Sequence, residues 1–382
     1  MAGNQVNEPT IQPPRSRRGL WIILGIVVVA VIILAAGLAT SWFGLLGPAP
    51  IQLNGAGSSF VFPLMSAWSN EYKNLTGVQI NYVGSGSGAG ITAVIQKNVD
   101  FGATDAPLNS TAHNQNPTLL TIPESLGAVT VSYNLPGAPS HLNLTGPIIA
   151  NIYLGKITSW SDPNITAINP GLTSTSPISV EYRSDSSGTT FVFTDYLSKV
   201  SSQWSTQVGK GKTVNWPVGS GHPQNAGVAL AVKQTVGAIG YVELAYALQN
   251  NFSYAAILNA AGNYILPSLA STAAAAASAA ASLPAGNGDW SHVSITNANG
   301  TGSYPISTFT YLLVYQELNV YSGGMTQTKA QALVAFLWWA VHSGQTEAAS
   351  LSYAPLSSAA AVVTLDETTI RTITFNGMPL ST

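Results

Sequence analysis

The sequence has no cysteine and very little charge. Only 7% of its 382 residues are charged, against about 25% in ordinary soluble domains. Without cysteine the chain can form no disulfide framework and offers no thiol for a lipid anchor, so the fold depends on its core alone. The formal net charge of −2, with no basic patch, excludes a general attraction to nucleic acid.

The motifs of several enzyme classes are also missing. The chain has no Gly-x-x-x-x-Gly-Lys-Ser/Thr phosphate loop and no His-Glu-x-x-His zinc motif, and its histidines are scattered without ligand spacing. No Gly-x-Ser-x-Gly motif is followed by suitable triad partners. A metal hydrolase or serine phosphatase therefore has little support, and we expect neither a metal nor a cofactor.

The first fifty residues differ in kind from the rest. A basic cluster of Arg15, Arg17 and Arg18 precedes an uncharged apolar run over residues 19–46, which is longer than the roughly 20 residues that span a bilayer. This order predicts a cytoplasmic tail over residues 1–18, a single-pass transmembrane anchor over 19–46 and an extracytoplasmic remainder. A cleaved secretory signal is the alternative, although the apolar region of such a signal is normally about 7–15 residues long.

Asn-x-Ser/Thr sequons fit an exported glycoprotein. A chain rich in Ser, Thr and Asn produces several of them by chance, so they only support the prediction of export. They stand at Asn74, Asn109, Asn143, Asn164, Asn251 and Asn299.

From about residue 51, short apolar strands alternate with helical patterns, which predicts an α/β fold. The first elements expected are strand 51–53, helix 60–73, strand 78–83, helix 91–97 and strand 100–103. Buried strands at 129–134 and 308–315 bracket a middle region, as if one lobe were inserted in another and the chain crossed twice. The Ala/Ser-rich residues 269–283 are predicted to be helical because alanine has the highest helix propensity, and apolar spacing predicts a packed helix over 327–343.

Three glycine- and serine-rich turns lead directly into helical patterns, at residues 55–60, 84–90 and 183–190. A helix start carries unpaired N–H groups and a positive partial charge, and glycine lets an anion approach the backbone, so each turn is a candidate oxyanion seat. Three such turns favour a tetrahedral oxyanion held without metal. The second turn also matches a dinucleotide-binding fingerprint, but a lone match is weak and leaves the other two turns unexplained.

Two kinds of charged residue refine this hypothesis. Arg183 is one of only two arginines beyond the apolar run, and its planar fork of donors suits a tetrahedral oxyanion, with Asp185 placed to orient it. Asp105 would repel a fully ionised anion but can accept a hydrogen bond from hydrogen phosphate, a bond that sulfate cannot offer. Ordinary roles are the alternatives: a helix cap after Arg183 and a turn aspartate at 105.

Several blocks together resemble the phosphate-binding proteins of ABC-type phosphate uptake systems. In order, they are residues 55–60, 99–108, 153–157, 183–189 and 237–243. The resemblance runs from about residue 55 to near the C-terminus and implies a two-lobed periplasmic-binding-protein type II fold with two crossing hinge strands, here preceded by the transmembrane helix. It implies a first part of lobe 1 over 50–127, lobe 2 over 128–300 and a second part of lobe 1 over 301–382.

The resemblance also implies a ligand set, with Asp185 as the orienting partner of the arginine. The phosphate-binding residues would be Ser59, Phe60 through its backbone N–H, Ser87, Asp105, Arg183, Ser187, Gly188 and Thr189. This chain departs from the family pattern at Ser59, where threonine is common, and at Pro63, which lies later than usual. Residues 269–283 are also unlike the pattern, and their position suggests a surface of the second lobe away from the cleft.

The sequence therefore predicts a monomeric, membrane-anchored, extracytoplasmic receptor that closes on inorganic phosphate and presents it to an ABC permease. It would catalyse nothing, because ATP would be hydrolysed by a separate cytoplasmic subunit. The alternatives are a secreted phosphate-ester hydrolase, a binding protein for sulfate or molybdate, and a phosphate sensor or adhesion module without transport.

Overall fold

The computed structural model describes residues 50–382 apart from 278, 322 and 323, and Ile51–Thr382 forms one compact unit. The predicted tail over residues 1–18 and anchor over 19–46 lie outside the described residues. Among the residues described, no helix has the length and apolar character needed to cross a membrane.

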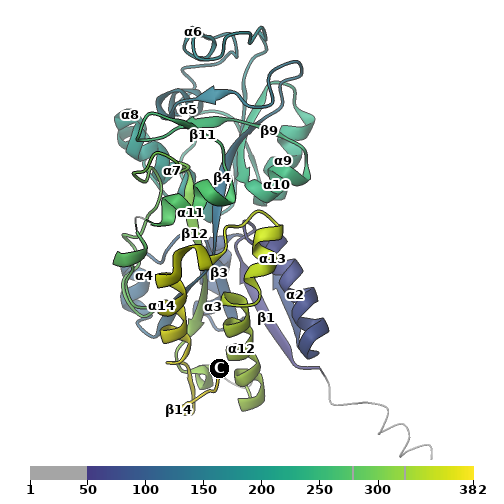
Figure 1. Ribbon diagram of the computed structural model, residues 1–382, viewed down its shortest axis with the longest axis vertical. Coiled ribbons are helices and arrows are strands. Elements are labelled where there is room, and N and C mark those ends of the chain that lie inside the picture. Colours follow the sequence, from purple (N-terminus) through teal and green to yellow (C-terminus); the bar gives the residue numbers. More distant parts are fainter. Residues whose placement is uncertain (1–49, 278, 322–323) are drawn as a thin grey trace, which may run out of the picture. The chain divides into compact units, whose positions relative to one another are not determined.

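A mixed sheet runs through this unit in the order β2-β1-β3-β12-β4-β8-β6-β7, with β9 also paired to β4 (Figure 1). We call lobe 1 the part built on β1, β2, β3, β12 and the first ten residues of β4, and lobe 2 the part built on the end of β4 with β6, β7, β8 and β9. The strands of lobe 1 are β1 (Gln52–Gly57), β2 (Gln79–Val83), β3 (Phe101–Thr104), β4 (Leu119–Tyr133) and β12 (Ser307–Tyr315). Those of lobe 2 are β6 (Ser179–Arg183), β7 (Ser220–His222), β8 (Ala238–Glu243) and β9 (Ser253–Tyr254).

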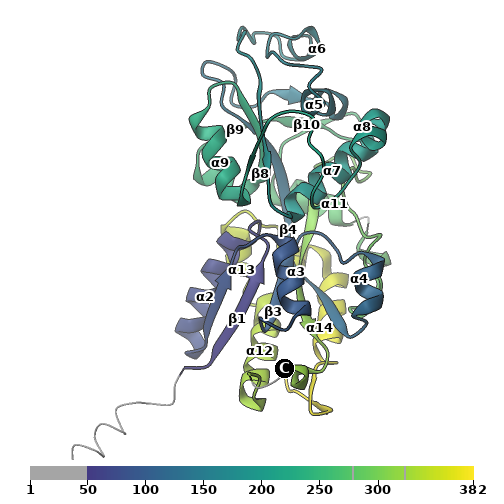
Figure 2. The same ribbon diagram turned by 180° about the vertical axis from the view of Figure 1, so that it is seen from behind.

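Helices cover both faces of the sheet (Figures 1 and 2). On lobe 1 they are α2 (Phe62–Thr76), α3 (Ser87–Ile95), α4 (Ser110–Gln115), α12 (Gln327–Val341), α13 (Gln345–Ser350) and α14 (Ala360–Ile370), with short 3₁₀ turns η2 (Leu318–Val320) and η3 (Leu356–Ala359). On lobe 2 they are α5 (Gly146–Tyr153), α6 (Pro163–Thr166), α7 (Gly188–Val200), α8 (Ser202–Gln207), α9 (Gln224–Gln234) and α10 (Leu244–Gln249). Two small sheets are separate from the main one. The first consists of β5 (Asn143–Leu144), β10 (Ala256–Leu258) and β11 (Tyr264–Ile265), and the second is the hairpin of β13 (Thr374–Phe375) and β14 (Met378–Pro379).

The two lobes are joined by β4, which is buried along its whole length. Residues 119–128 pair with β12 in lobe 1, and residues 129–133 pair with β8 in lobe 2. The sequence predicted only the second stretch, because Pro123 and Glu124 interrupt the apolar pattern of the first. The register shifts at this point, with Pro123 opposite Tyr311 and Ser125 opposite Thr310, so Glu124 is the extra residue of a bulge, where proline is tolerated.

The Ala/Ser-rich segment is helical as predicted, forming α11 (Leu269–Ala277) and the 3₁₀ turn η1 (Ala280–Ser282). Its expected place on the second lobe away from the cleft is wrong, because α11 packs against both β4 and β12. Small side chains allow a helix to approach a sheet closely, which explains why this composition suits the position. The buried face consists of Ser271, Thr272, Ala275 and Ala276.

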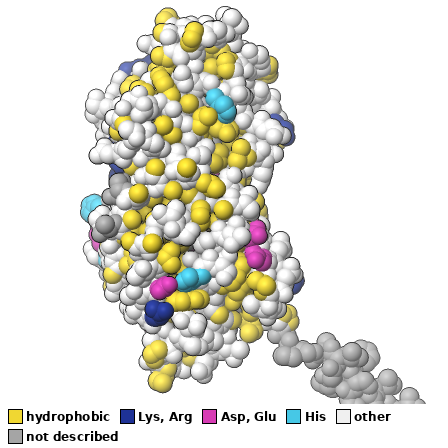
Figure 3. Space-filling view, in the orientation of Figure 1, with side chains coloured by type: hydrophobic (Ala, Val, Ile, Leu, Met, Phe, Trp, Pro, Cys, Tyr) yellow, Lys and Arg dark blue, Asp and Glu magenta, His cyan; other side chains and the backbone are white. Residues whose placement is uncertain are grey.

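The core is rich in aromatic side chains. In lobe 1, Trp68 and Tyr72 of α2 contact Phe336 and Trp339 of α12. Charge is sparse on the surface as well, and Figure 3 shows only scattered charged side chains on the face that it presents. The fold is therefore held by apolar packing and backbone hydrogen bonds, with ion pairs in a minor role.

Candidate oxyanion-binding site

The first turn follows β1 and lies directly against β3. Gly57 has φ +146°, and a Cβ there would lie 2.0 Å from the carbonyl oxygen of Ala103, so only glycine fits. The next residue, Ser58, donates its hydroxyl to Asp105 Oδ1 at 2.5 Å and accepts the Phe60 N–H at 3.0 Å. The resemblance implied Ser59 as a ligand and gave no role to Ser58, because nothing local in the sequence shows which of two adjacent serines in a turn faces the aspartate.

The second turn supplies a hydroxyl to the same aspartate. Gly86 has φ +95° and precedes α3, whose first residue, Ser87, lies 3.4 Å from Asp105 Oδ2 and accepts the Asp105 N–H at 3.2 Å. Asp105 is 1% exposed. Burial raises its pKa to about 7 despite the opposing effects of the Ser58 hydrogen bond, the Arg183 charge and the Ser87 hydroxyl.

The third turn begins with a buried arginine whose guanidinium group is hydrogen-bonded on two sides. Arg183 donates from Nε and Nη2 to the two carboxylate oxygens of Asp185, at 2.7 and 2.5 Å. Its Nη1 donates to Thr189 Oγ1 at 3.3 Å and to Asn225 Oδ1 at 3.2 Å. Burial alone would raise the pKa of Asp185, but the hydrogen bonds and charge of Arg183 hold it below its usual value, so the pair stays ionised.

The third turn also starts α7, where the predicted residues meet the other two turns. Ser187 caps the helix by accepting the Thr190 N–H at 3.0 Å. A Cβ on Gly188 would lie 2.4 Å from Ser87 Oγ and 2.5 Å from Asp105 Oδ2. The start of α7 in lobe 2 therefore faces the aspartate and the serine of lobe 1 at close range, and its first N–H groups have no acceptor within the helix.

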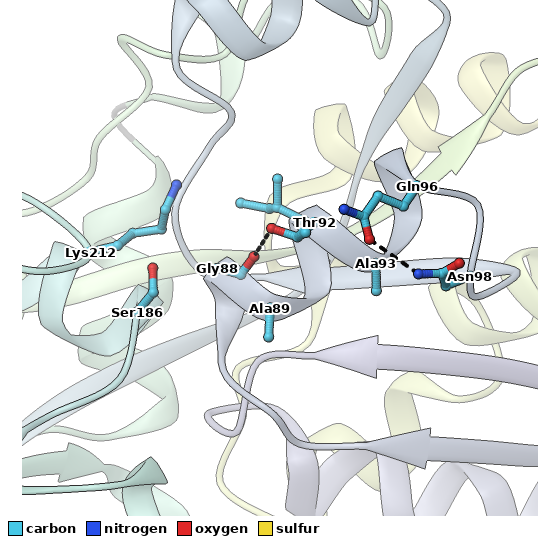
Figure 4. Close-up of a pocket in the computed structure, with 9 residues that line it drawn as sticks. Gly88, Ala89, Thr92, Ala93, Gln96, Asn98, Ser186 and Lys212 are labelled. Atoms are coloured by element: carbon cyan, nitrogen blue, oxygen red, sulfur yellow. Dashed lines mark hydrogen bonds between the residues drawn. The ribbon is translucent and has the colours of Figure 1, made fainter.

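The lobes are in contact around this cluster. Gly88 N–H donates to Ser186 O at 2.9 Å, and Asn225 N–H donates to Ser59 Oγ at 3.2 Å. Figure 4 shows Ser186 and Lys212 across from Gly88 at the edge of the contact, where a surface pocket of about 600 Å³ opens. The cluster itself lies inside, in the closed arrangement of the two lobes.

Three tyrosine hydroxyls hold the carbonyl groups of the first turn. They come from distant parts of the chain and donate to three consecutive residues: Tyr82 to Ser58 O at 2.7 Å, Tyr246 to Ser59 O at 3.1 Å and Tyr353 to Phe60 O at 2.6 Å. Fixing these carbonyls fixes the orientation of the peptide groups and of their N–H donors. Nothing local in the sequence marks these tyrosines, because each contact is made only by the folded chain.

The arrangement gathers hydroxyl, peptide and guanidinium donors around one buried carboxylate. Such a set suits a tetrahedral oxyanion that still carries a proton, since the carboxylate can accept that proton's hydrogen bond. In the part of the chain that the structure describes, no group of three or more His, Cys, Asp or Glu side chains is placed to hold a metal ion.

The comparisons with known proteins agree with this geometry. Residues 47–343 match the family model of the PBP superfamily domain. The phosphate-binding protein PstS of Xylella fastidiosa is 44% identical over 315 residues, covering 80% of this chain and 82% of that protein. The protein of the same name from Haemophilus influenzae is 42% identical over 307 residues, covering 80% and 89%.

Among solved structures, the phosphate-binding protein from Stenotrophomonas maltophilia aligns with a TM-score of 0.62 and 21% identity, over 84% of this chain and 94% of that one. At that identity the likeness concerns the fold, and it confirms the two-lobed α/β architecture. The chain therefore belongs to the PBP superfamily and, within it, to the family of the phosphate-binding proteins PstS.

Proposed function

We propose that this protein binds inorganic phosphate between its two lobes and delivers it to an ABC importer. Its relatives of 42–44% identity are phosphate-binding proteins by name. The observation that carries the proposal is Asp105, a buried carboxylate surrounded by the donors Ser58, Ser87 and Arg183. Hydrogen phosphate completes this site because it can accept from the guanidinium and the free peptide N–H groups and give its own proton to the carboxylate.

The predicted ligand set belongs to the same proposal. We assign phosphate to Ser59, the Phe60 N–H, Ser87, Asp105, Arg183, Ser187, Gly188 and Thr189, with Asp185 orienting the arginine. Contacts between these residues support the assignment: Ser87 and Gly188 adjoin Asp105, and Thr189 contacts Arg183. Binding replaces the hydration of the anion with fixed donors in a buried site, where each hydrogen bond is electrostatically stronger than in water.

The protein is a receptor and not an enzyme. It presents phosphate to permease subunits, and a separate cytoplasmic ATPase supplies the energy. We also infer that residues 19–46 anchor a monomeric, extracytoplasmic protein whose exposed sequons carry glycans; five of the six asparagines concerned are exposed, all but Asn143. The division into 50–127, 128–300 and 301–382 stays part of the proposal, and β4, which pairs in both lobes, supports it.

Calorimetric titration of residues 50–382 with phosphate and then with sulfate, at matched ionic strength, tests the proposal. We expect tight binding of phosphate and none of sulfate. Binding of both anions would overturn the role of Asp105 in selectivity, and binding of neither would overturn the proposal in favour of a sensor, an organophosphate ligand or a hydrolase.

A further inference from the structure

Asn225 lies inside the cluster but belongs to none of the three turns. It is the second residue of α9, is fully buried, and touches both lobes of the site. Its Oδ1 accepts from Arg183 Nη1 at 3.2 Å, while its backbone N–H donates to Ser59 Oγ at 3.2 Å. It is thus the immediate neighbour of two residues assigned to phosphate.

The side-chain amide of Asn225 has a donor without a partner. Its Nδ2 is buried and makes no hydrogen bond. The orientation of the amide is set by chemistry, because a guanidinium can only donate and must therefore face Oδ1. Exchanging the oxygen and nitrogen would place N–H groups against N–H groups, so Nδ2 points away from Arg183.

A buried donor without an acceptor is costly and rare, which indicates that its partner arrives with a ligand. The arginine itself has little donor capacity left for an anion. Of its five N–H groups, two are used by Asp185, and Nη1 is shared between Thr189 and Asn225. A further neutral donor at this place adds to the few N–H groups that Arg183 can still offer to an anion.

We propose that Nδ2 of Asn225 donates a hydrogen bond to an oxygen of the bound oxyanion, which makes Asn225 an additional ligand. This inference rests on the proposed function and deepens it. The same residue couples ligand binding to contact between the lobes, because its backbone N–H holds Ser59 of lobe 1 while its side chain holds Arg183 of lobe 2.

The variant Asn225→Asp tests whether the unpaired amide N–H of Asn225 faces the bound anion. Aspartate keeps the shape and the acceptor that faces Arg183, but replaces the donor with a charged acceptor. We expect phosphate affinity, measured by calorimetry on the full-length chain, to fall at least 100-fold, since a hydrogen bond to a charged group is lost and repulsion is added. The added charge would also weaken anion binding if Asn225 only positioned Arg183, so the response of its amide protons to phosphate separates these two roles.

A second measurement does not depend on any variant. In the unaltered chain labelled with ¹³C and ¹⁵N, titration with inorganic phosphate should shift the side-chain amide pair of Asn225, which is assigned through its connectivity to the Asn225 backbone. The matched control is Asn134→Asp, which makes the same change in lobe 2 at a half-buried amide that donates to Lys233 O. It should alter phosphate affinity by less than about twofold.

The outcomes are distinct. If the unaltered chain does not bind phosphate, the proposed function fails. If it binds phosphate but Asn225→Asp binds within threefold, or the amide pair does not respond to phosphate, the inference about Asn225 is overturned while the receptor function stands. If the variant does not fold, the response of the amide pair in the unaltered chain decides.

Discussion

Replacing Asp105 with asparagine is expected to abolish the discrimination between phosphate and sulfate. The carboxylate is 1% exposed, with Ser58 and Ser87 hydroxyls at its two oxygens. Phosphate can give it a proton-mediated hydrogen bond, whereas sulfate has no proton near neutral pH and would place one negative charge against another. The substitution removes the charge and supplies an N–H donor of the same size.

The magnitude follows from the contact distance. Two unit charges about 3 Å apart repel by about 5.5 kcal/mol at an effective dielectric constant of about 20, which corresponds to about four powers of ten in affinity. Asp105→Asn removes this penalty for sulfate. For phosphate it loses a hydrogen bond to a charged acceptor, about 1.5–3 kcal/mol, or about 10- to 150-fold. At pH 8 the carboxyl can avoid this repulsion by taking up a proton at a cost of about tenfold, because its pKa is about 7. We therefore expect a selectivity between about tenfold and 10⁴ to fall to about one or below.

Calorimetry at pH 8 with both anions, at matched ionic strength, measures the two affinities. Asp162→Asn is the control, because Asp162 caps α6 on the surface of lobe 2 and asparagine caps a helix as well as aspartate. The pH dependence gives a second check: the pKa of Asp105 in the closed site is about 7, so sulfate should bind the unaltered protein better as pH falls from 9 to 7, by up to about tenfold per unit, and its affinity should level off below about pH 6. An unchanged selectivity in Asp105→Asn would refute the reasoning.

Three further predictions concern the fork, the tyrosines and the buried glutamates. Arg183→Lys should lower phosphate affinity at least 100-fold in the same titration, because an ammonium cannot make the paired bonds of the fork; an affinity within tenfold would contradict this. Tyr246→Phe should weaken phosphate binding about fivefold through the loss of one hydrogen bond to Ser59 O, about 1 kcal/mol, and an effect below twofold would argue against a role in orienting the turn. Burial raises the pKa of Glu124 and of Glu243 to about 8, so the stability they contribute is complete below about pH 4.5 and is lost as pH rises towards 8. The free energy of unfolding from urea titrations should then fall by up to about 1.4 kcal/mol per pH unit for each glutamate, whereas a flat profile between pH 5 and 8 would show that these carboxyls are already ionised.

The features of the site that could be predicted are those that a few neighbouring residues determine. Glycine followed by serine at a helix start indicates an anion seat because the backbone itself supplies the donors. The spacing of Arg183 and Asp185 placed a carboxylate where it can hold the fork, and the structure shows both bonds. Asp105, which precedes Ala-Pro, could be singled out because a carboxylate would repel a fully ionised anion.

The parts that were missed depend on contacts between distant residues. Tyr353 reaches Phe60 across 293 positions, and Asn225 reaches Ser59 across 166. The hydrogen bond from Ser58 to Asp105 is made only in the folded chain, and the bulge at Glu124 interrupts the periodicity of the first ten residues of β4. A local sequence pattern contains no information about these contacts or about the bulge.

Local patterning was thus sufficient for the α/β class and for locating the three turns on which the proposed oxyanion site rests, because backbone conformation and side-chain type decide those within a few residues. The convergence of the turns on one carboxylate, the tyrosines that orient the first turn and the unpaired amide of Asn225 were decided only when β4 and β12 brought the lobes together. Hydrogen bonds act over about 3 Å, so the atoms that complete the site are selected by the packing of segments that the sequence keeps far apart.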